Sequence, residues 1–138
     1  MTNHKIQITK QIQMNNDKYQ NQLFDLEDRT LHFAKNCIDL TKMIMRDAVN
    51  IELINRLIRE SSSVGANYRE ANDSLAKKEF YHRIGISRRE SKESKCWLEL
   101  LAHSNTKYTE KITPLIDEAL QLLKIFSAIV QKESKAKT

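Results

Sequence analysis

The sequence predicts an all-α protein, an antiparallel up-down-up-down four-helix bundle, and three observations support this fold class. Only two glycines and one proline occur in 138 residues, whereas a β-rich fold needs many tight turns that these residues usually supply. The composition is rich in residues common in helices, such as Leu, Lys, Glu, Ala and Gln. Apolar residues recur at steps of three and four along four long segments joined by short links, which is the pattern of an antiparallel bundle.

Three regions are expected along the chain: a flexible N-terminal arm at residues 1–21, the bundle at 22–134, and a frayed tail at 135–138. The arm is polar and rich in Gln and Asn, with a weak strand-like alternation of Ile and Met. The first helix should span residues 23–45 and carry two adjacent apolar stripes. Because two stripes make a wider apolar face than a simple bundle helix needs, we expect surplus apolar surface that self-association into a ring would cover.

The second helix should span residues 51–72, after a short break at 47–50, and it contains the unusual stretch SSSVGANYREA. Ser61 and Gly65 continue its apolar stripe, so we expect them to face a neighbouring helix. A glycine inside a helix costs about 1 kcal/mol relative to alanine, and close approach of another backbone would offset that cost. The alternative is a helix that ends near Ser61 in a serine-rich loop.

The third helix should span residues 75–103, with Ser74 as its N-cap. One heptad seam of this helix is apolar at both ends and carries three serines at its centre, Ser87, Ser91 and Ser94. We therefore expect the second and third helices to cross closely at their serine-rich levels, with hydroxyl groups bonding across the gap. Such partners are needed because a buried hydroxyl without one costs about 1–3 kcal/mol.

The fourth helix should begin at Thr109 or at Thr113 and end at Gln131, on a strong apolar stripe. Pro114 fits the first helical position behind a Thr113 cap, and it is still tolerated in the first turns if the helix begins earlier.

The two cysteines, Cys37 and Cys96, lie far apart and form no CxxC pair. The sequence also has no secretory signal pattern, and its apolar runs are shorter than the ~20 residues of a membrane span. These features favour free thiols in a cytoplasmic protein without membrane association, rather than a disulfide.

No set of residues predicts catalysis, a metal site or a bound cofactor. The four histidines are scattered and no Glu-x-x-His motif occurs, so a carboxylate-bridged metal site in the bundle core is not supported. Glu90 and Glu93 are interpreted as ion-pair partners of Lys92 and Lys95 rather than as catalytic carboxylates. The expectation is a protein that is not an enzyme.

The net charge of +5 is concentrated in the middle of the chain, where residues 56–95 carry ten basic and six acidic side chains. A basic surface on the second and third helices could bind nucleic-acid phosphates without reading bases, and the alternative is an ordinary solvated surface of mixed charge. The ten candidate nucleic-acid-binding residues are Arg56, Arg59, Arg69, Lys77, Lys78, Arg83, Arg88, Arg89, Lys92 and Lys95.

The runs RLIRESSSVGANYREA and KKEFYHRIGISRRESKESKCWLELL resemble the four-helix-bundle family of 23S ribosomal RNA intervening-sequence proteins. This family includes the accessory variability proteins of diversity-generating retroelements. The resemblance covers roughly residues 25–131 and is most specific at SVGANYREA and ESKCWLELL. Tyr68 and Arg69 depart from the N-I-A-E version of the motif and are closer to an N-Y-R subgroup.

The resemblance implies a homopentamer and a role with RNA or DNA, with a reverse transcriptase as partner in the retroelement relatives. Three hypotheses therefore remain open: an oligomeric RNA-binding bundle, a protein-binding scaffold or adaptor, and, least supported, a small-molecule or metal binder.

Overall fold

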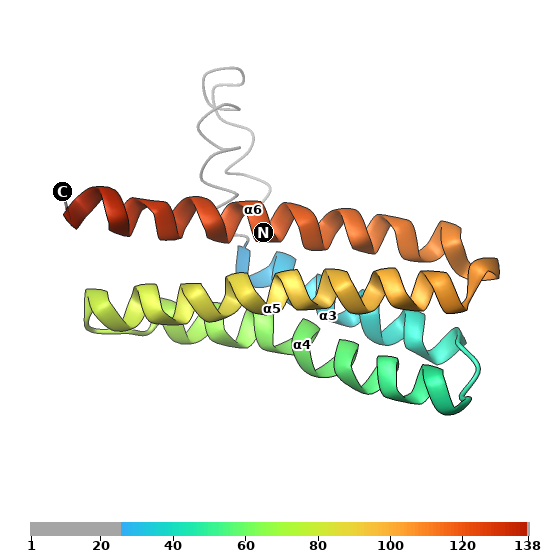
Figure 1. Cartoon of the computed structure of the whole chain (residues 1–138). Helices are drawn as coiled ribbons and strands as arrows, with labels where there is room; N and C mark the ends of the chain where they lie inside the picture. Colours follow the sequence, from blue (N-terminus) through green and yellow to red (C-terminus); the bar gives the residue numbers. More distant parts are fainter. Residues whose placement is uncertain (1–25, 138) are drawn as a thin grey trace, which may run out of the picture.

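The computed structural model describes residues 26–137 of the chain, and the expected N-terminal arm lies outside them. Within this part the chain forms four α-helices and one 3₁₀ turn and no strand, which confirms the all-α prediction. The helices run alternately in opposite directions, as expected for an up-down-up-down bundle (Figure 1). Their bounds are α3 Leu26–Met43, α4 Ala48–Asn72, α5 Lys77–Ser104 and α6 Thr109–Lys137, with the 3₁₀ turn η1 at Thr106–Tyr108.

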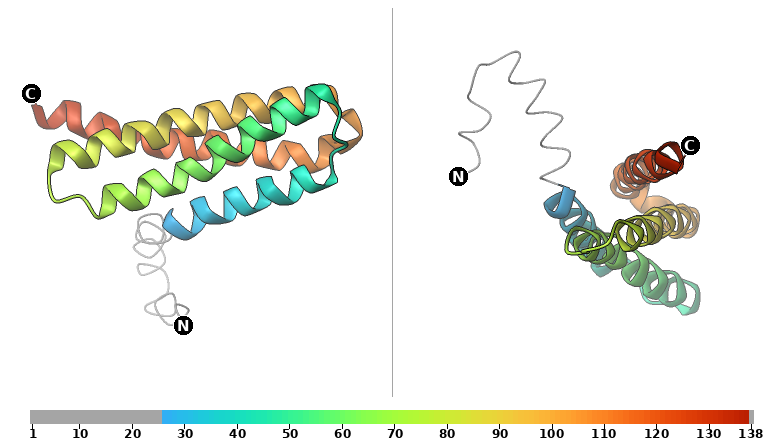
Figure 2. Two further views of the ribbon diagram at one scale, coloured as in Figure 1. Left: turned by 90° about the horizontal axis from the view of Figure 1, so that it is seen from below. Right: turned by 90° about the vertical axis from the view of Figure 1, so that its left-hand side faces the viewer.

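The four helices are unequal in length, and this decides how they cover one another. Helix α3 has 18 residues, about 27 Å, whereas α5 has 28 and α6 has 29, about 42–44 Å. Helix α3 lies along the half of the bundle that holds the α3–α4 and α5–α6 connections (Figures 1 and 2). Helix α5 packs extensively on both α4 and α6, while α3 packs mainly on α4 and meets α6 over a small area.

The core lies between the facing apolar stripes of the four helices. It is built from side chains that are almost fully removed from water, including Phe33, Leu57, Ile84, Leu98, Leu122 and Phe126. Burying each such side chain stabilises the fold by about 1.5–3 kcal/mol. Tyr68 of α4 packs on Phe126 of α6 with their ring centroids 5.7 Å apart, so the aromatic contact joins two helices that are not direct neighbours.

The stretch SSSVGANYREA is helical throughout, so the alternative of a serine-rich loop is wrong. Ser61 and Gly65 are buried, as expected for residues on a packing face. Gly65 lies against Thr30 of α3. The Ser61 side chain forms a hydrogen bond with the thiol of Cys37, which also lies on α3. Ser61 and Gly65 therefore pack on α3, whereas the sequence suggested α5 as their neighbour.

The serines of α5 bear out the expected bonding across the α4–α5 gap at one position. Ser87 donates its hydroxyl hydrogen to the Val64 carbonyl of α4 at 2.8 Å. Ser91 instead donates to the Ser87 carbonyl of its own helix at 2.8 Å. Ser94 Oγ has no hydrogen-bond partner within the described part of the chain. Of these three serines, only Ser87 thus bonds across the α4–α5 gap.

The starts of α4 and α5 differ from the sequence expectations. Asp47 accepts a hydrogen bond from the Asn50 backbone amide at 2.8 Å, so it caps α4, which begins earlier than expected. Ser74 does not cap α5, because its hydroxyl donates to the Glu70 carbonyl at the end of α4 at 3.0 Å. Helix α5 begins only at Lys77 and has no side-chain cap.

Helix α6 begins at Thr109, the earlier of the two expected starts, and Pro114 lies inside it. It continues beyond Gln131 to Lys137, so the C-terminal segment prolongs the helix along α5. None of the helices between residues 26 and 137 combines the length and the apolar character required to cross a bilayer.

Candidate nucleic-acid interface

The ten basic residues predicted to bind nucleic acid do not form one continuous surface. Arg69 pairs with Glu27 of α3 at 3.4 Å. Arg83 donates to the Asn67 side chain of α4 at 3.0 Å, and Arg88 donates to Ser127 of α6 at 2.9 Å. The three arginines thus have their partners on three different helices, and the basic set is divided among several sides of the bundle.

Other members of the set are engaged with partners on α5. The guanidinium of Arg56 lies 5.3 Å from the centre of the Trp97 ring, a favourable cation–π contact. Arg89 pairs with Glu90 at 3.2 Å, and Lys95 pairs with Glu99 one turn away at 2.9 Å. The expected ion pairs of Glu90 and Glu93 with Lys92 and Lys95 are not among those that residues 26–135 form.

Four predicted cations remain exposed, and their side chains form no ion pair, hydrogen bond or ring contact among the described residues: Arg59, Lys77, Lys78 and Lys92. Lys77 and Lys78 lie at the first turn of α5. Since ten helical residues span about 15 Å, these two lysines are distant from the Arg88 level of the same helix. Of the four, Lys92 is the one that combines with other cations at a groove.

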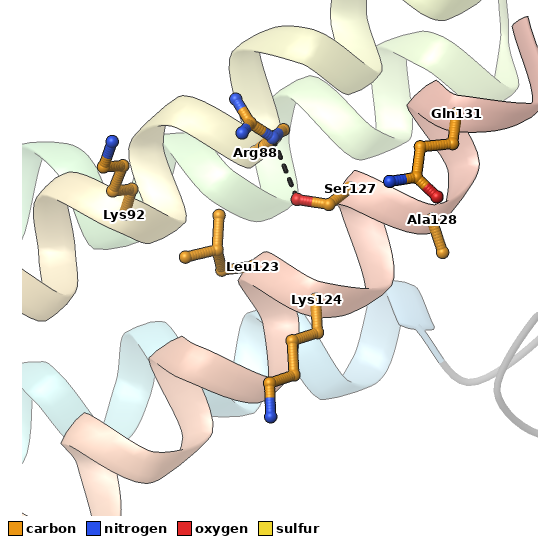
Figure 3. A pocket seen from close by; sticks show the side chains of 7 residues that line it. All are labelled: Arg88, Lys92, Leu123, Lys124, Ser127, Ala128 and Gln131. Carbon is orange, nitrogen blue, oxygen red and sulfur yellow. Dashed lines mark hydrogen bonds between the residues drawn. The ribbon is translucent and has the colours of Figure 1, made fainter. Parts of the chain in front are cut away.

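That groove lies between α5 and α6 and has a volume of about 380 Å³. Figure 3 shows Arg88 bonded to Ser127 of α6 and Leu123 between the two helices, with the ammonium groups of Lys92 and Lys124 pointing to opposite sides of the view. The lining of the groove contains three cations and no acidic side chain. The lining residues are Arg88, Lys92, Leu123, Lys124, Ser127, Ala128 and Gln131.

Helical spacing explains why these residues meet. Arg88 and Lys92 are four residues apart, so they lie on the same face of α5 one turn from each other. On α6 the polar residues Lys124, Ser127 and Gln131 follow steps of three and four, which places them on one face as well. Since α5 and α6 are antiparallel neighbours, the two faces border a common groove.

The hydrogen bond from Arg88 Nε to Ser127 Oγ orients the guanidinium at the groove wall. It uses one of the five N–H donors of arginine, and the four hydrogens on the two Nη atoms have no partner among the described residues. The groove can therefore offer oriented donors and three positive charges to an anion with several oxygens, such as a phosphate.

The sequence reading missed the α6 side of this groove. Lys124, Ser127 and Gln131 lie in the segment 96–138, whose net charge is only +1, and α6 was read for its apolar stripe alone. The signal that could have found them is the polar row beside that stripe, at steps of three and four.

A second polar cluster lies between α4 and α5 and is acidic. Glu60, Glu90 and Glu93 bring one carboxylate oxygen each within 4.8 Å of the others, and no histidine or cysteine takes part. Burial raises the pKa of Glu90, the Arg89 hydrogen bond lowers it, and the neighbouring Glu93 and Glu60 charges raise it. These three carboxylates are the described residues best placed to hold a metal ion.

The fold and the groove define an all-helical bundle protein with a cationic, solvent-facing groove on two of its helices. Residues 24–128 match the model of the 23S rRNA-intervening sequence proteins, and the chain belongs to this family. The resemblance seen in the sequence is thereby confirmed.

A solved structure shows the same fold. It is the crystal structure, at 1.70 Å resolution, of a protein of unknown function from the S23 ribosomal protein family of Bacteroides thetaiotaomicron VPI-5482. The two sequences are 25% identical, the TM-score is 0.68, and the match covers 75% of this chain and 96% of the other. No curated protein matches the sequence.

Proposed function

We propose that this protein is a non-enzymatic bundle that binds RNA through the phosphate backbone, in the groove between α5 and α6. The observation that carries the proposal is that Arg88, Lys92 and Lys124 all line one groove, whose lining contains no acidic side chain. The charge surplus of residues 56–95 and the family of intervening-sequence proteins support it.

The chemistry of the groove favours backbone contacts over base recognition. Lysine and arginine neutralise phosphates, while the free Nη hydrogens of Arg88 can donate to two phosphate oxygens at once. Each phosphate contact releases condensed counterions, so the logarithm of affinity should fall by about 0.7–0.9 per contact for each tenfold rise in salt. Three cations per protomer give a slope of about −2 to −3, and an oligomer would multiply the contacts.

Filter binding of a structured RNA across a salt series tests the proposal. The groove variant carries Arg88→Gln, Lys92→Gln and Lys124→Gln, and its control carries Lys35→Gln, Lys42→Gln and Lys111→Gln. Both lose three charges from exposed side chains, but only the first loses them from the groove. We expect the groove variant to lose retention and most of its salt slope while the control keeps both. Equal losses in the two variants, or no retention of RNA by the unmodified protein at low salt, would overturn the proposal. A DNA duplex of the same length shows which nucleic acid is preferred.

A second candidate function, a scaffold that binds copies of itself or another protein, is supported by exposed apolar side chains. Leu31 and Ile38 lie seven residues apart on α3 and are 42% and 38% exposed, so they share one outward face. Further exposed apolar residues gather around the α3–α4 connection: Met43, Met45, Val49 and Ile51. We propose that the outer α3 face mediates self-association, with the pentamer implied by the sequence resemblance as the expected state.

Sedimentation velocity distinguishes this second function from the first. Leu31→Gln with Ile38→Gln should lower the mass of the assembly, whereas the groove variant should leave the mass unchanged. If the protein acts only as an adaptor, for example for a reverse transcriptase, the groove variant will also leave a pulldown of that partner intact. A monomeric unmodified protein at micromolar concentration would contradict the self-association.

A further inference from the structure

Glu60 of α4 and Glu90 and Glu93 of α5 form a carboxylate cluster that the proposed RNA-binding groove does not use. Glu90 and Glu93 are three residues apart and share one face of α5, and Glu60 reaches them from the neighbouring helix. One oxygen of each lies within 4.8 Å of the other two. Residues from two helices therefore bring three negative charges into a small volume.

The protein supplies too little positive charge to compensate them. The described ion pairs give the cluster one arginine, Arg89, whose Nη2 lies 3.2 Å from Glu90 Oε1. The Arg89 side chain is 61% exposed, so water screens much of its charge. Both hydrogen bonds from Arg89 go to Oε1 of Glu90, so the other carboxylate oxygen of Glu90 receives none from Arg89.

An independent observation indicates a missing ligand at this place. Glu60 is only 7% exposed, and its Oε2 is buried without a hydrogen-bond partner in the described part of the protein. Ser94 Oγ, one turn from Glu90 along α5, and Trp97 Nε1, two turns from it, are also buried and without a hydrogen-bond partner in the described part of the protein. A buried carboxylate oxygen without a partner is costly, so either a proton or a cation must neutralise the cluster.

The spacing and the donor atoms favour a cation. Calcium–oxygen bonds of 2.3–2.6 Å place oxygens on opposite sides of one ion about 4.6–5.2 Å apart, and neighbouring oxygens lie closer. All three oxygens therefore fit within one coordination shell when they lie at most 4.8 Å apart. A set made only of carboxylates suits hard ions such as Ca²⁺, Mg²⁺ or Mn²⁺ rather than zinc or copper.

We propose that Glu60, Glu90 and Glu93 bind one hard divalent cation between α4 and α5. The ion joins the middle of the two helices and neutralises the buried charge of Glu60. Because the protein provides three ligand side chains, water completes the coordination, as is usual for Mg²⁺ sites. The site is structural, and it lies on a different helix pair from the α5–α6 groove.

The first measurement uses the full chain, stripped of metal with a chelator and then dialysed. Titration with Mn²⁺ followed by electron paramagnetic resonance should show one saturable site per protomer. Calorimetric titration with Ca²⁺ and Mg²⁺ ranks the three ions. The melting temperature should rise with the concentration of the ion that binds, since the ligand binds the folded state.

Variants connect the binding to the three carboxylates. Glu60→Gln and Glu93→Gln should each weaken Mn²⁺ binding at least tenfold and remove the metal-dependent rise in melting temperature. Glu52→Gln is the matched control, because Glu52 is an exposed glutamate two turns from Glu60 on the same helix, and it should change neither quantity. Far-UV circular dichroism verifies that each variant is folded.

Two results would overturn the proposal. One is the absence of saturable Mn²⁺, Ca²⁺ and Mg²⁺ binding in the unmodified protein. If Glu60→Gln then also raises the melting temperature, the carboxylates of the cluster share protons instead of a metal ion. The other is binding that persists in both Glu60→Gln and Glu93→Gln, which would place the ion elsewhere. The measurement on the unmodified protein remains decisive even if one variant fails to fold.

Discussion

Gly65 of α4 and Thr30 of α3 lie so close together that a side chain at Gly65 has no room. A Cβ atom at Gly65 would be 2.7 Å from Thr30 Oγ1 and 3.1 Å from Thr30 Cβ. The Thr30 hydroxyl donates to the Leu26 carbonyl at 2.8 Å and also contacts the Glu27 carbonyl at 3.0 Å. Because these bonds hold Thr30 in place, the contact fixes how closely α3 approaches α4.

Gly65→Ala should therefore destabilise the protein, although alanine is the better helix former. The gain of about 1 kcal/mol in helix propensity is outweighed by overpacking, which typically costs about 1–3 kcal/mol, so we expect a net loss of up to about 2 kcal/mol. Urea denaturation measures it.

Gly85→Ala on α5 is the matched control, since a Cβ there meets nothing within 4 Å. This variant should be more stable than the unmodified protein by up to about 1 kcal/mol. The double variant Gly65→Ala with Thr30→Ala should recover part of the loss, because it removes the closest atom. If both glycine variants gained stability equally, the close contact would be refuted.

The two cysteines should differ sharply in reactivity. Cys37 is fully buried, and burial raises the pKa of its thiol to about 12 despite the opposing hydrogen bond from Ser61. Since the thiolate is the reactive species, Ellman's reagent should modify Cys96, which is exposed, quickly and Cys37 only upon unfolding. In the native protein one thiol should react rapidly with the reagent, and in native Cys96→Ser none should. In the denatured protein both thiols should react rapidly. Two fast thiols in the native protein would contradict the packing of α3 on α4.

Glu90 should make stability depend on pH in mildly acidic solution. Burial, opposed by Arg89 and reinforced by Glu93 and Glu60, raises its folded-state pKa above the ordinary value of about 4.3. The folded protein then binds a proton more tightly than the unfolded chain does, so this group contributes stability below its ordinary pKa and loses it as the pH rises through the folded value.

In chelator-containing buffer, the unmodified protein should thus gain stability relative to Glu90→Gln as the pH falls from 7 toward 5. Melting temperatures of both proteins across this range test the sign. If the melting temperatures of the two proteins changed in parallel with pH, the pKa of Glu90 would be the same in the folded and unfolded protein, and the prediction would be wrong. With the metal ion present the difference should shrink, because cation and proton compete for the same oxygens.

The ion pair between Arg29 of α3 and Glu118 of α6 closes the bundle where these two helices barely meet. Arg29 Nε and Nη2 donate to the two carboxylate oxygens of Glu118 at 2.7 and 2.8 Å, a bidentate geometry. Because both side chains are partly exposed, we expect Glu118→Gln to cost only about 0.5–1 kcal/mol.

The loss for Glu118→Gln should become smaller in 1 M salt, where surface charges are screened. Asp117→Gln is its control, since Asp117 is an adjacent exposed acid without an ion pair in the described residues. Chemical denaturation at two salt concentrations provides the comparison, and equal effects of both substitutions would contradict the pair's role.

The sequence by itself determined the helices of this protein. Periodicity fixed the approximate extent of each one and carried α4 through SSSVGANYREA, because a helix repeats its faces every 3.6 residues whether a face is apolar or merely small. It also identified Gly65 as a residue on a packing face and placed Arg88 and Lys92 among the candidate nucleic-acid-binding residues.

Only the tertiary structure decided which helix each face meets. Gly65 admits Thr30 of α3, Arg88 meets Ser127 of α6, and Glu60 joins Glu90 from another helix. Periodicity gives the angle of a residue around its own helix axis, but the neighbour at that angle depends on the lengths and crossing of all four helices. For the same reason the basic residues, which all lie between positions 56 and 95, are divided among different sides of the bundle.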